Sequence, residues 1–296
     1  MEQFRNIGII GRMGSIRVLD TIRRLKRYLI GRHLHVILED RIAEMLPGHN
    51  LQTSSRKLLG EVCDLVIVVG GDGSMLGAAR ALAQHKVPVL GINRGSLGFL
   101  TDILPEHLES QISEVLAGNY TTEQRFLLEA EVRRDGVTIG EGDALNDVVF
   151  HPGKSTRMIE FELFIDGQFV YSLKADGLII ATPTGSTAYA LSAGGPIMHP
   201  RLDAIVIVPM HPHTLSSRPI VVDADSELKV VVAEDMSIYP LVSCDGQNHV
   251  TCAPGDTLHV QRKPQKLHLI HPLDHNFYAV CRDKLGWGSR LGQDNK

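Results

Sequence analysis

The spacing of apolar residues changes near Gln124, and this change most constrains the fold. Before it, short, largely apolar runs alternate with segments in which apolar residues recur every three or four positions. The runs RNIGIIG, LHVILE, DLVIVVGG and VPVLGIN are typical of buried parallel strands, and VLDTIRRLKRYLI, SMLGAARALAQ and PEHLESQISEVLAG of amphipathic helices. This alternation predicts an α/β domain over residues 1–124, with a parallel sheet and helical crossovers.

Beyond Gln124 the apolar residues alternate with polar ones. FLLEAEVRRDGVTIGEG and FELFIDGQFVYSL each contain an Asp-Gly pair, at 135–136 and 166–167, which is a strong signal for a tight hairpin turn. Further strand patterns follow in AIVIVPM, PIVV, ELKVVVA, DTLHVQR and KLHLIH. We therefore predict an all-β, sandwich-like second domain over residues 125–271. The tail, from about 272 to 296, contains the helix-like FYAVCRDKLGWG, and we expect it to pack back on the first domain.

Composition narrows the class of protein. The net charge is −4, with 43% hydrophobic and 22% charged residues, as in ordinary globular proteins, so no nucleic-acid partner is expected. No run approaches the ~18 apolar residues of a membrane span, and the first residues lack a signal-peptide pattern, so we expect no membrane association and a cytoplasmic location. The four cysteines form no C-x-x-C pair, which favours buried thiols over a zinc or redox site.

The stretch GGDG, residues 70–73, directly follows the predicted strand DLVIVV and precedes a helix expected to begin near Ser74. Ligands of open α/β sheets bind at the carboxyl ends of the strands, and a helix N-terminus attracts phosphate. Gly70, Gly71, Gly73 and Ser74 are therefore a candidate phosphate loop. Asp72 would repel a phosphate unless a divalent cation lies between them or the carboxylate accepts a substrate hydroxyl's proton, and a kinase requires both. The simpler alternative is that Asp72 only caps the next helix.

A second stretch rich in glycine and hydroxyl residues, ADGLIIATPTGSTAYALSAGGPI at 175–197, lies in the β-rich half. Together with Tyr189 it could hold a sugar and a planar base, or be an ordinary Ser/Thr/Gly loop. Weaker patterns are set aside. The glycines at 8, 11 and 14 miss the dinucleotide spacing by one position, GKS at 153–155 lacks the rest of a P-loop, and His211 and His213 lack further metal ligands.

Four motifs, GGDGS at 70–74, NRGSLGFL at 93–100, NDVV at 146–149 and TPTGSTAYALSAGGPI at 182–197, closely resemble those of the NAD kinase family in order and spacing. The resemblance extends beyond CDGQ at 244–247 and so covers nearly the whole chain. It implies transfer of the terminal phosphate of ATP, or of polyphosphate, to the 2′-hydroxyl of the adenosine ribose of NAD, giving NADP. It also implies a divalent cation, with Mg²⁺ held mainly by phosphates near Asp72, and a homodimer or homotetramer.

The resemblance further implies roles for individual residues. Asp72 corresponds to the proton acceptor, with Gly73 beside the bound nucleotide, and Asn146 and Asp147 are expected to hold the adenine and the ribose hydroxyls. Tyr189 is expected to pack against a ring, Asp176 to reach the nicotinamide amide, and Phe99 to border the pocket. The remaining residues expected to contact NAD are Arg157, Lys174, Thr187, Ala188, Ala190, Leu191, Ser192 and Gln247.

Two alternatives to an NAD kinase stay open at this point. Lipid kinases and phosphofructokinase-type sugar kinases share a GGDG loop, although the long motif at 182–197 opposes that interpretation. A dinucleotide sensor without activity would keep the pocket but would need no carboxylate at Asp72.

Overall fold

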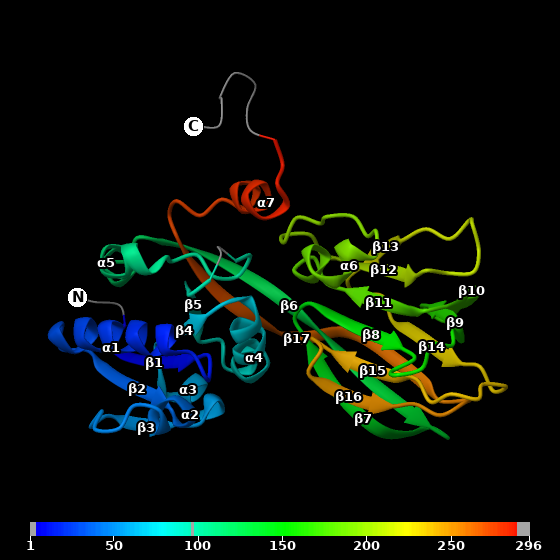
Figure 1. The fold of residues 1–296 in the computed structure, drawn as a ribbon, viewed down its shortest axis with the longest axis horizontal. Coiled ribbons are helices and arrows are strands. Elements are labelled where there is room, and N and C mark those ends of the chain that lie inside the picture. Colours follow the sequence, from blue (N-terminus) through cyan, green and yellow to red (C-terminus); the bar gives the residue numbers. More distant parts are fainter. Residues whose placement is uncertain (1–3, 96–97, 289–296) are drawn as a thin grey trace. The chain divides into compact units, whose positions relative to one another are not determined.

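The protein is described from a computed structural model that covers residues 4–95 and 98–288 (Figure 1). Two compact units make up the chain. One combines residues 1–124 with 267–296, and the other consists of residues 125–266.

The first unit is built on a parallel sheet. Its strands are β1 (Asn6–Gly11), β2 (His35–Glu39), β3 (Gln52–Ser54), β4 (Leu65–Gly70) and β5 (Pro88–Asn93), in the order β3-β2-β1-β4-β5. The end of β17 (Thr257–Pro272) adds a further parallel strand, since His268 pairs with Pro88. The predicted α/β sheet is thus confirmed, and β3, with only three residues, is an addition that no periodic pattern signals.

The helices of this unit are α1 (Ile16–Gly31), α2 (Asp40–Glu44), α3 (Arg56–Val62), α4 (Asp72–Leu82), α5 (Leu108–Leu116) and α7 (Phe277–Leu285), with 3-10 turns η1 (Ala83–His85) and η2 (Pro105–His107). Helix α1 lies along β1 and β2 (Figure 1) and buries Ile22, Leu25 and Leu29 in one apolar core with Ile9 and with Ile112 of α5. The sequence pattern did not predict α2 and α3, because five and seven residues are too few to show a helical period.

The second unit is an all-β sandwich, as predicted. Its elements are β6 (Tyr120–Arg134), β7 (Val137–Ala144), β8 (Asp147–His151), β9 (Ile159–Ile165), β10 (Gln168–Ala175), β11 (Gly177–Ala181), η3 (Gly185–Thr187), α6 (Tyr189–Ser192), β12 (Ala204–Met210), β13 (Ile220–Asp223), β14 (Leu228–Val232), β15 (Leu241–Cys244), β16 (Asn248–Thr251) and the first part of β17. One antiparallel sheet has the order β13-β12-β11-β8-β15-β16. The other joins β10, β9, β14 and β17, with β6 pairing with β17 and β7. Phe150 of the first sheet meets Phe161 of the second edge to face at 5.8 Å in the shared core.

Strand β11 is buried on both faces, and this explains its uninterrupted apolar sequence GLIIA. Leu178 and Ile180 point into the sandwich core. Ile179 lies on the opposite face and packs in a separate cluster with Ala190 and Met198. The segment that follows β11 therefore folds back over the outer face of its own sheet.

Both predicted hairpins are present. Asp135-Gly136 joins β6 to β7 with φ of 50° and 78°, and Asp166-Gly167 joins β9 to β10 with φ of 50° and 75°. Two consecutive positive φ angles are the conformation for which Asp-Gly is favoured.

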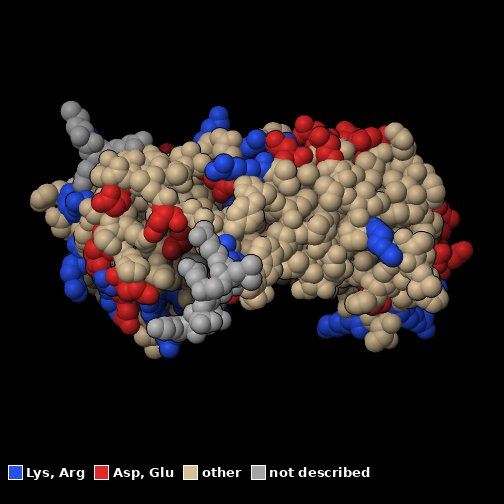
Figure 2. Space-filling view, turned by 90° about the horizontal axis from the view of Figure 1, so that it is seen from above, with Lys and Arg blue, Asp and Glu red and all other residues tan. Residues whose placement is uncertain are grey.

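Charged side chains of both signs occur on the face shown in Figure 2, in groups separated by uncharged residues. On the basic helix α1, Arg23 pairs with Asp20 and Arg24 pairs with Glu109 of α5. The four cysteines are free thiols in buried positions, as predicted. Among the described residues no helix combines the length and apolar character needed to cross a membrane.

Candidate active site

The GGDG segment forms the turn between β4 and α4 at the carboxyl end of the sheet. Strand β4 ends at Gly70, and Gly71, with extended backbone, is the N-cap of α4. The Gly71 carbonyl oxygen already accepts hydrogen bonds from the backbone N–H groups of Ser74 and Met75. For this reason the helix begins at Asp72, two residues earlier than the sequence pattern predicted.

The Asp72 carboxylate is fixed by the LGFL segment. Its Oδ2 accepts a hydrogen bond from the N–H of Phe99 and its Oδ1 one from the N–H of Leu100, both at 3.0 Å. The side chain therefore does not cap α4, and the capping interpretation is wrong. A Cβ atom at Gly98 would lie 2.2 Å from Asp72 Oδ1, so this arrangement requires glycine at position 98.

A cleft of about 290 Å³ opens at this turn. Its lining residues are Arg12, Ser15, Val18, Gly70, Gly71, Asp72, Gly73, Asn93, Arg94, Gly95, Gly98 and Lys284. A Cβ atom built on Gly71 or Gly73 would have no described atom within 4 Å, apart from those of its neighbours in sequence. These two glycines therefore leave open space beside their backbone. The N-terminus of the eleven-residue α4 and three cationic side chains make the cleft suited to an anion.

In the second unit, Asn146 and Asp147 form the turn into β8, and Asp245 holds this turn in place. The Asp245 carboxylate accepts the N–H groups of Leu145 at 3.0 Å and Asn146 at 2.8 Å, and that of Asp147 at 3.3 Å. Asp147 is only 6% exposed. Burial, and secondarily the negative charge of Asp245, raise the pKa of Asp147 to about 7.

The TPTG segment packs directly against this turn. The backbone N–H of Thr182 donates to the Asn146 carbonyl oxygen at 2.9 Å, and Thr182 Oγ1 donates to the Leu145 carbonyl oxygen at 2.5 Å. A Cβ atom on Gly185 would lie 2.1 Å from the Asn146 carbonyl oxygen, so only glycine allows this approach. The NDVV and TPTG motifs, which begin 36 positions apart in sequence, therefore form one substructure at one end of β8 and β11.

The expected contacts from Thr187 to Ser192 follow in η3 and α6 of the same segment. Tyr189 is 49% exposed, so its ring has a free face, whereas Ala190 is fully buried against the sheet. Gln247 lies in the β15–β16 turn, next to Asp245, whose N–H donates to the Asp147 carbonyl oxygen. These residues share the end of the sheet at which Asp147 lies.

Three of the residues expected to contact NAD do not lie at this end of the sheet: Arg157, Lys174 and Asp176. Asp147 pairs with Ala181 at the end of β11, whereas Asp176 immediately precedes that strand. Thr182 lies six positions after Asp176 along the extended strand, about 20 Å away at the usual rise. Arg157 follows the far end of β8, where it donates to Ser237 Oγ at 2.6 Å, and Lys174 is the second-last residue of β10, two positions before Asp176. One chain therefore does not bring these three residues to the Asn146–Asp147 turn.

Several residues of the site have no counterpart in the sequence-based expectations. Asp245 is part of the CDGQ motif but was not expected to have a role of its own, although its Asp-Gly pair signals a turn. Arg12 and Arg94 directly follow β1 and β5, so the rule that ligands bind at the carboxyl ends of parallel strands could have identified them. Lys284 comes from α7, distant in sequence, and no local signal marks it.

Comparison with known proteins gives a consistent result. The family model for the ATP-NAD kinase N-terminal domain matches residues 7–120, and that for the ATP-NAD kinase C-terminal domain matches residues 145–272. The NAD kinase of Ectopseudomonas mendocina (strain ymp) is 82% identical over 292 residues, and that of Pseudomonas syringae pv. tomato 80%, each match covering 99% of both chains.

Solved structures share the fold. Yeast NADH kinase complexed with NADH superposes with a TM-score of 0.88 at 26% identity, covering 99% of this chain and 91% of that one. An NAD kinase from Archaeoglobus fulgidus in complex with ATP has a TM-score of 0.73 at 24% identity, covering 96% and 100%. From its two matching domains and its full-length relatives, the chain belongs to the NAD kinase family.

Proposed function

We propose that this NAD kinase transfers the terminal phosphate of ATP to the 2′-hydroxyl of the adenosine ribose of NAD, with Asp72 as the general base. The 2′-oxygen attacks the terminal phosphorus, the bond from that phosphorus to the bridging oxygen of ADP breaks, and the hydroxyl proton passes to Asp72. The products are NADP and ADP. The observation that carries this proposal is that the fixed carboxylate of Asp72 lines a glycine-rich, cationic cleft.

The cleft is the proposed site for the phosphate donor. Gly70, Gly71, Gly73 and Ser74 offer backbone at the start of α4, and Arg12, Arg94 and Lys284 supply positive charge for a triphosphate or a polyphosphate. Phosphoryl transfer needs this combination of positioning and charge neutralisation.

A magnesium ion fits the cleft beside Asp72, where donor phosphate oxygens would be its main ligands and water oxygens would complete the set. When bound, the ion would neutralise charge developing on the transferred phosphoryl group.

The Asn146–Asp147 turn and the Thr187–Ser192 segment are the proposed site for the adenosine part of NAD. A buried carboxylate and an amide side chain are suited to ribose hydroxyls and an adenine edge, and the exposed ring of Tyr189 is suited to stacking. The yeast relative binds NADH. We therefore propose that the reduced dinucleotide also fits here.

Arg157, Lys174 and Asp176 are proposed to contact NAD bound to a second copy of the chain. Within one chain, the path along β11 from Asp176 to Thr182 is closed, since Leu178 faces the sandwich core and Ile179 is covered by Ala190. A dinucleotide at one end of the strand therefore cannot follow the strand to the other end. A homo-oligomer would bring the two groups of residues together.

The first test is the rate of NADP formation from NAD with ATP and magnesium, coupled to an NADP-specific dehydrogenase, beside a reaction in which polyphosphate replaces ATP. Asp72→Asn is expected to lower turnover by about 10²- to 10⁴-fold while NAD binding, measured by calorimetry, persists. Turnover within a few-fold of wild type would refute the role of Asp72. Binding of NAD without turnover in the wild-type enzyme, with both donors, would favour a dinucleotide sensor.

The shared site is tested by mixing inactive variants. Asp72→Asn and Asp176→Ala chains, co-expressed with different tags and purified together, are expected to recover a fraction of wild-type activity, because mixed oligomers contain some intact sites. In the control, Asp20→Asn, on the exposed face of α1, replaces Asp176→Ala as the chain co-expressed with Asp72→Asn. No recovery in verified mixed oligomers would show that Asp176 acts within its own chain.

A further inference from the structure

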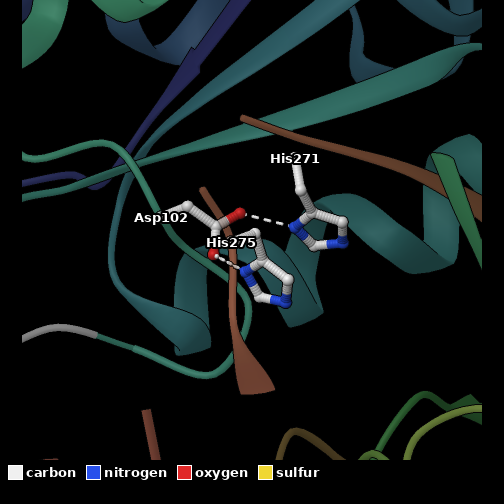
Figure 3. A group of neighbouring side chains, drawn as sticks. All are labelled: Asp102, His271 and His275. Carbon is white, nitrogen blue, oxygen red and sulfur yellow. Dashed lines mark hydrogen bonds and ion pairs between the residues drawn. The ribbon is translucent and has the colours of Figure 1, made fainter. Parts of the chain in front are cut away.

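A largely buried cluster of Asp102, His271 and His275 lies outside the cleft described above (Figure 3). His271 Nδ1 lies 2.5 Å from Asp102 Oδ2, and His275 Nδ1 lies 2.8 Å from Asp102 Oδ1. The two imidazole rings are stacked, with centroids 4.1 Å apart and planes 22° apart. His271 Nε2 lies 3.2 Å from Glu123 Oε2. One carboxylate therefore ties together two histidines from the end of the chain.

Asp102 belongs to the same short segment that holds Asp72. Two residues before it, Leu100 donates its N–H to Asp72, and the preceding N–H, of Phe99, does the same. The far end of the segment is tied to β5, because the N–H groups of Asp102 and Ile103 both lie 3.2 Å from the Gly91 carbonyl oxygen. The position of the two N–H donors thus depends on how residues 98–103 are anchored.

The cluster is costly to bury unless its charges are matched. The Asp102 side chain is 8% exposed and that of His271 is 3% exposed. Burial of Asp102 opposes its ionisation, but the hydrogen bonds from both histidines outweigh it and lower the pKa of Asp102 to about 2. Burial likewise opposes protonation of His271, but hydrogen bonds to Asp102 and Glu123 raise its pKa to about 9. At neutral pH the ionised Asp102 and the protonated His271 form a buried ion pair, so removing either one takes a charge partner from the other.

We propose that Asp102, His271 and His275 are positioning residues that hold segment 98–103 and thereby fix the Asp72 carboxylate for catalysis. The proposal rests on the role proposed above for Asp72. It assigns the end of β17 and the loop before α7 a function in the reaction, because these supply the two histidines.

Two histidines and a carboxylate are also a common set of transition-metal ligands. The stacked geometry opposes that interpretation, since a metal ion must lie near the plane of each imidazole ring that binds it, and two nearly parallel rings 4.1 Å apart do not share such a point. In addition, each Nδ1 already contacts a different oxygen of Asp102.

The test compares Asp102→Asn, His275→Ala and His275→Gln, with Glu109→Gln as the matched control. Glu109 pairs with Arg24 on the surface of the same unit, so its variant removes an ion-paired carboxylate without touching the segment. Asp102→Asn and His275→Ala are expected to lower kcat by about 10- to 100-fold, as a small misplacement of a catalytic group does. KM for NAD and for ATP is expected to stay within about twofold. His275→Gln keeps an N–H donor for Asp102 and is expected to restore most of kcat.

Thermal unfolding is followed for each variant, and kcat is measured well below the unfolding midpoint. His275, which is partly exposed, keeps the test informative if Asp102→Asn does not fold. An unchanged kcat in His275→Ala, or equal loss in its Ala and Gln variants, would overturn the proposal. So would zinc retained in stoichiometric amount by the purified wild-type enzyme and lost in His275→Ala, which would assign a metal site instead.

Asp72→Asn is assayed in the same series. If it is inactive while the cluster variants behave as wild type, only the positioning proposal fails. If it is active, the role proposed for Asp72 fails first.

Discussion

Asp147→Asn is expected to stabilise the protein at neutral pH, because it removes the free-energy cost of ionising a buried carboxylate. Burial and the charge of Asp245 raise the pKa of Asp147 from 3.8 to about 7. In the folded state Asp147 therefore stays protonated over a pH range in which the same carboxyl group of the unfolded chain is ionised. As pH rises from about 4 to about 7, stability falls, and the difference between the two pKa values corresponds to about 4 kcal/mol.

An asparagine resembles the neutral acid, so the variant avoids this cost. Urea unfolding near pH 7.5, followed by circular dichroism, should show a gain of up to about 4 kcal/mol in the free energy of unfolding, and near pH 5 less than half of that. Asp135→Asn, in the exposed β6–β7 turn, is the control, because asparagine tolerates its positive φ. Equal or lower stability of Asp147→Asn near pH 7.5 would refute the reasoning.

The same variant separates stability from binding. If ionised Asp147 accepts ribose hydroxyls, NAD should bind the wild type about tenfold more tightly near pH 8 than near pH 6, because the ionised fraction rises about tenfold across a pKa of about 7. Asp147→Asn should bind NAD more weakly, with this pH dependence removed. Calorimetric titration of NAD at both pH values measures it, and a wild-type affinity that does not change with pH would contradict the assignment.

Three further predictions concern backbone contacts and the buried histidine. Gly98→Ala would place a methyl group against Asp72, and we expect a loss of kcat of about 10²-fold with the fold retained, measured in the coupled assay; a kcat within twofold of wild type would contradict it. Gly185→Ala collides with the backbone of Asn146, and we expect a loss of about 1–3 kcal/mol or more in urea unfolding; unchanged stability would show that the turn can relax. The stability contributed by His271 should be fully present below about pH 6.5 and be lost as pH rises through about 9, so the difference between wild type and His271→Gln should shrink across that window; a constant difference would refute the raised pKa.

Patterns that repeat along the chain predicted the fold well. The buried runs of β1, β2, β4 and β5 and the two Asp-Gly hairpins were recognisable, because burial imposes a period and a tight turn imposes a residue type. Elements such as β3 and α2 could not be recognised from the sequence, because they are too short to show a period and depend on tertiary packing.

The candidate site was less predictable, because contacts between distant segments build it. GGDG predicts a phosphate loop at a strand end, but the partners of Asp72 lie 27 and 28 positions later, and those of Asp245 about 100 positions earlier. No local pattern contains that information. It is visible only once the fold brings the segments together.

Asp147 and Asp245 show why such a site persists despite its cost. Asp245 is satisfied by backbone N–H groups of the 145–147 turn, so it organises that turn. Asp147 is buried beside this negative charge, and its raised pKa leads us to expect that a neutral residue of the same shape would make the unit more stable. A group whose pKa is raised by burial and by a like charge is characteristic of functional sites, where stability is given up for activity. The cost of ionising Asp147, independent of any family resemblance, is thus the feature that makes the turn into β8 a candidate ligand site.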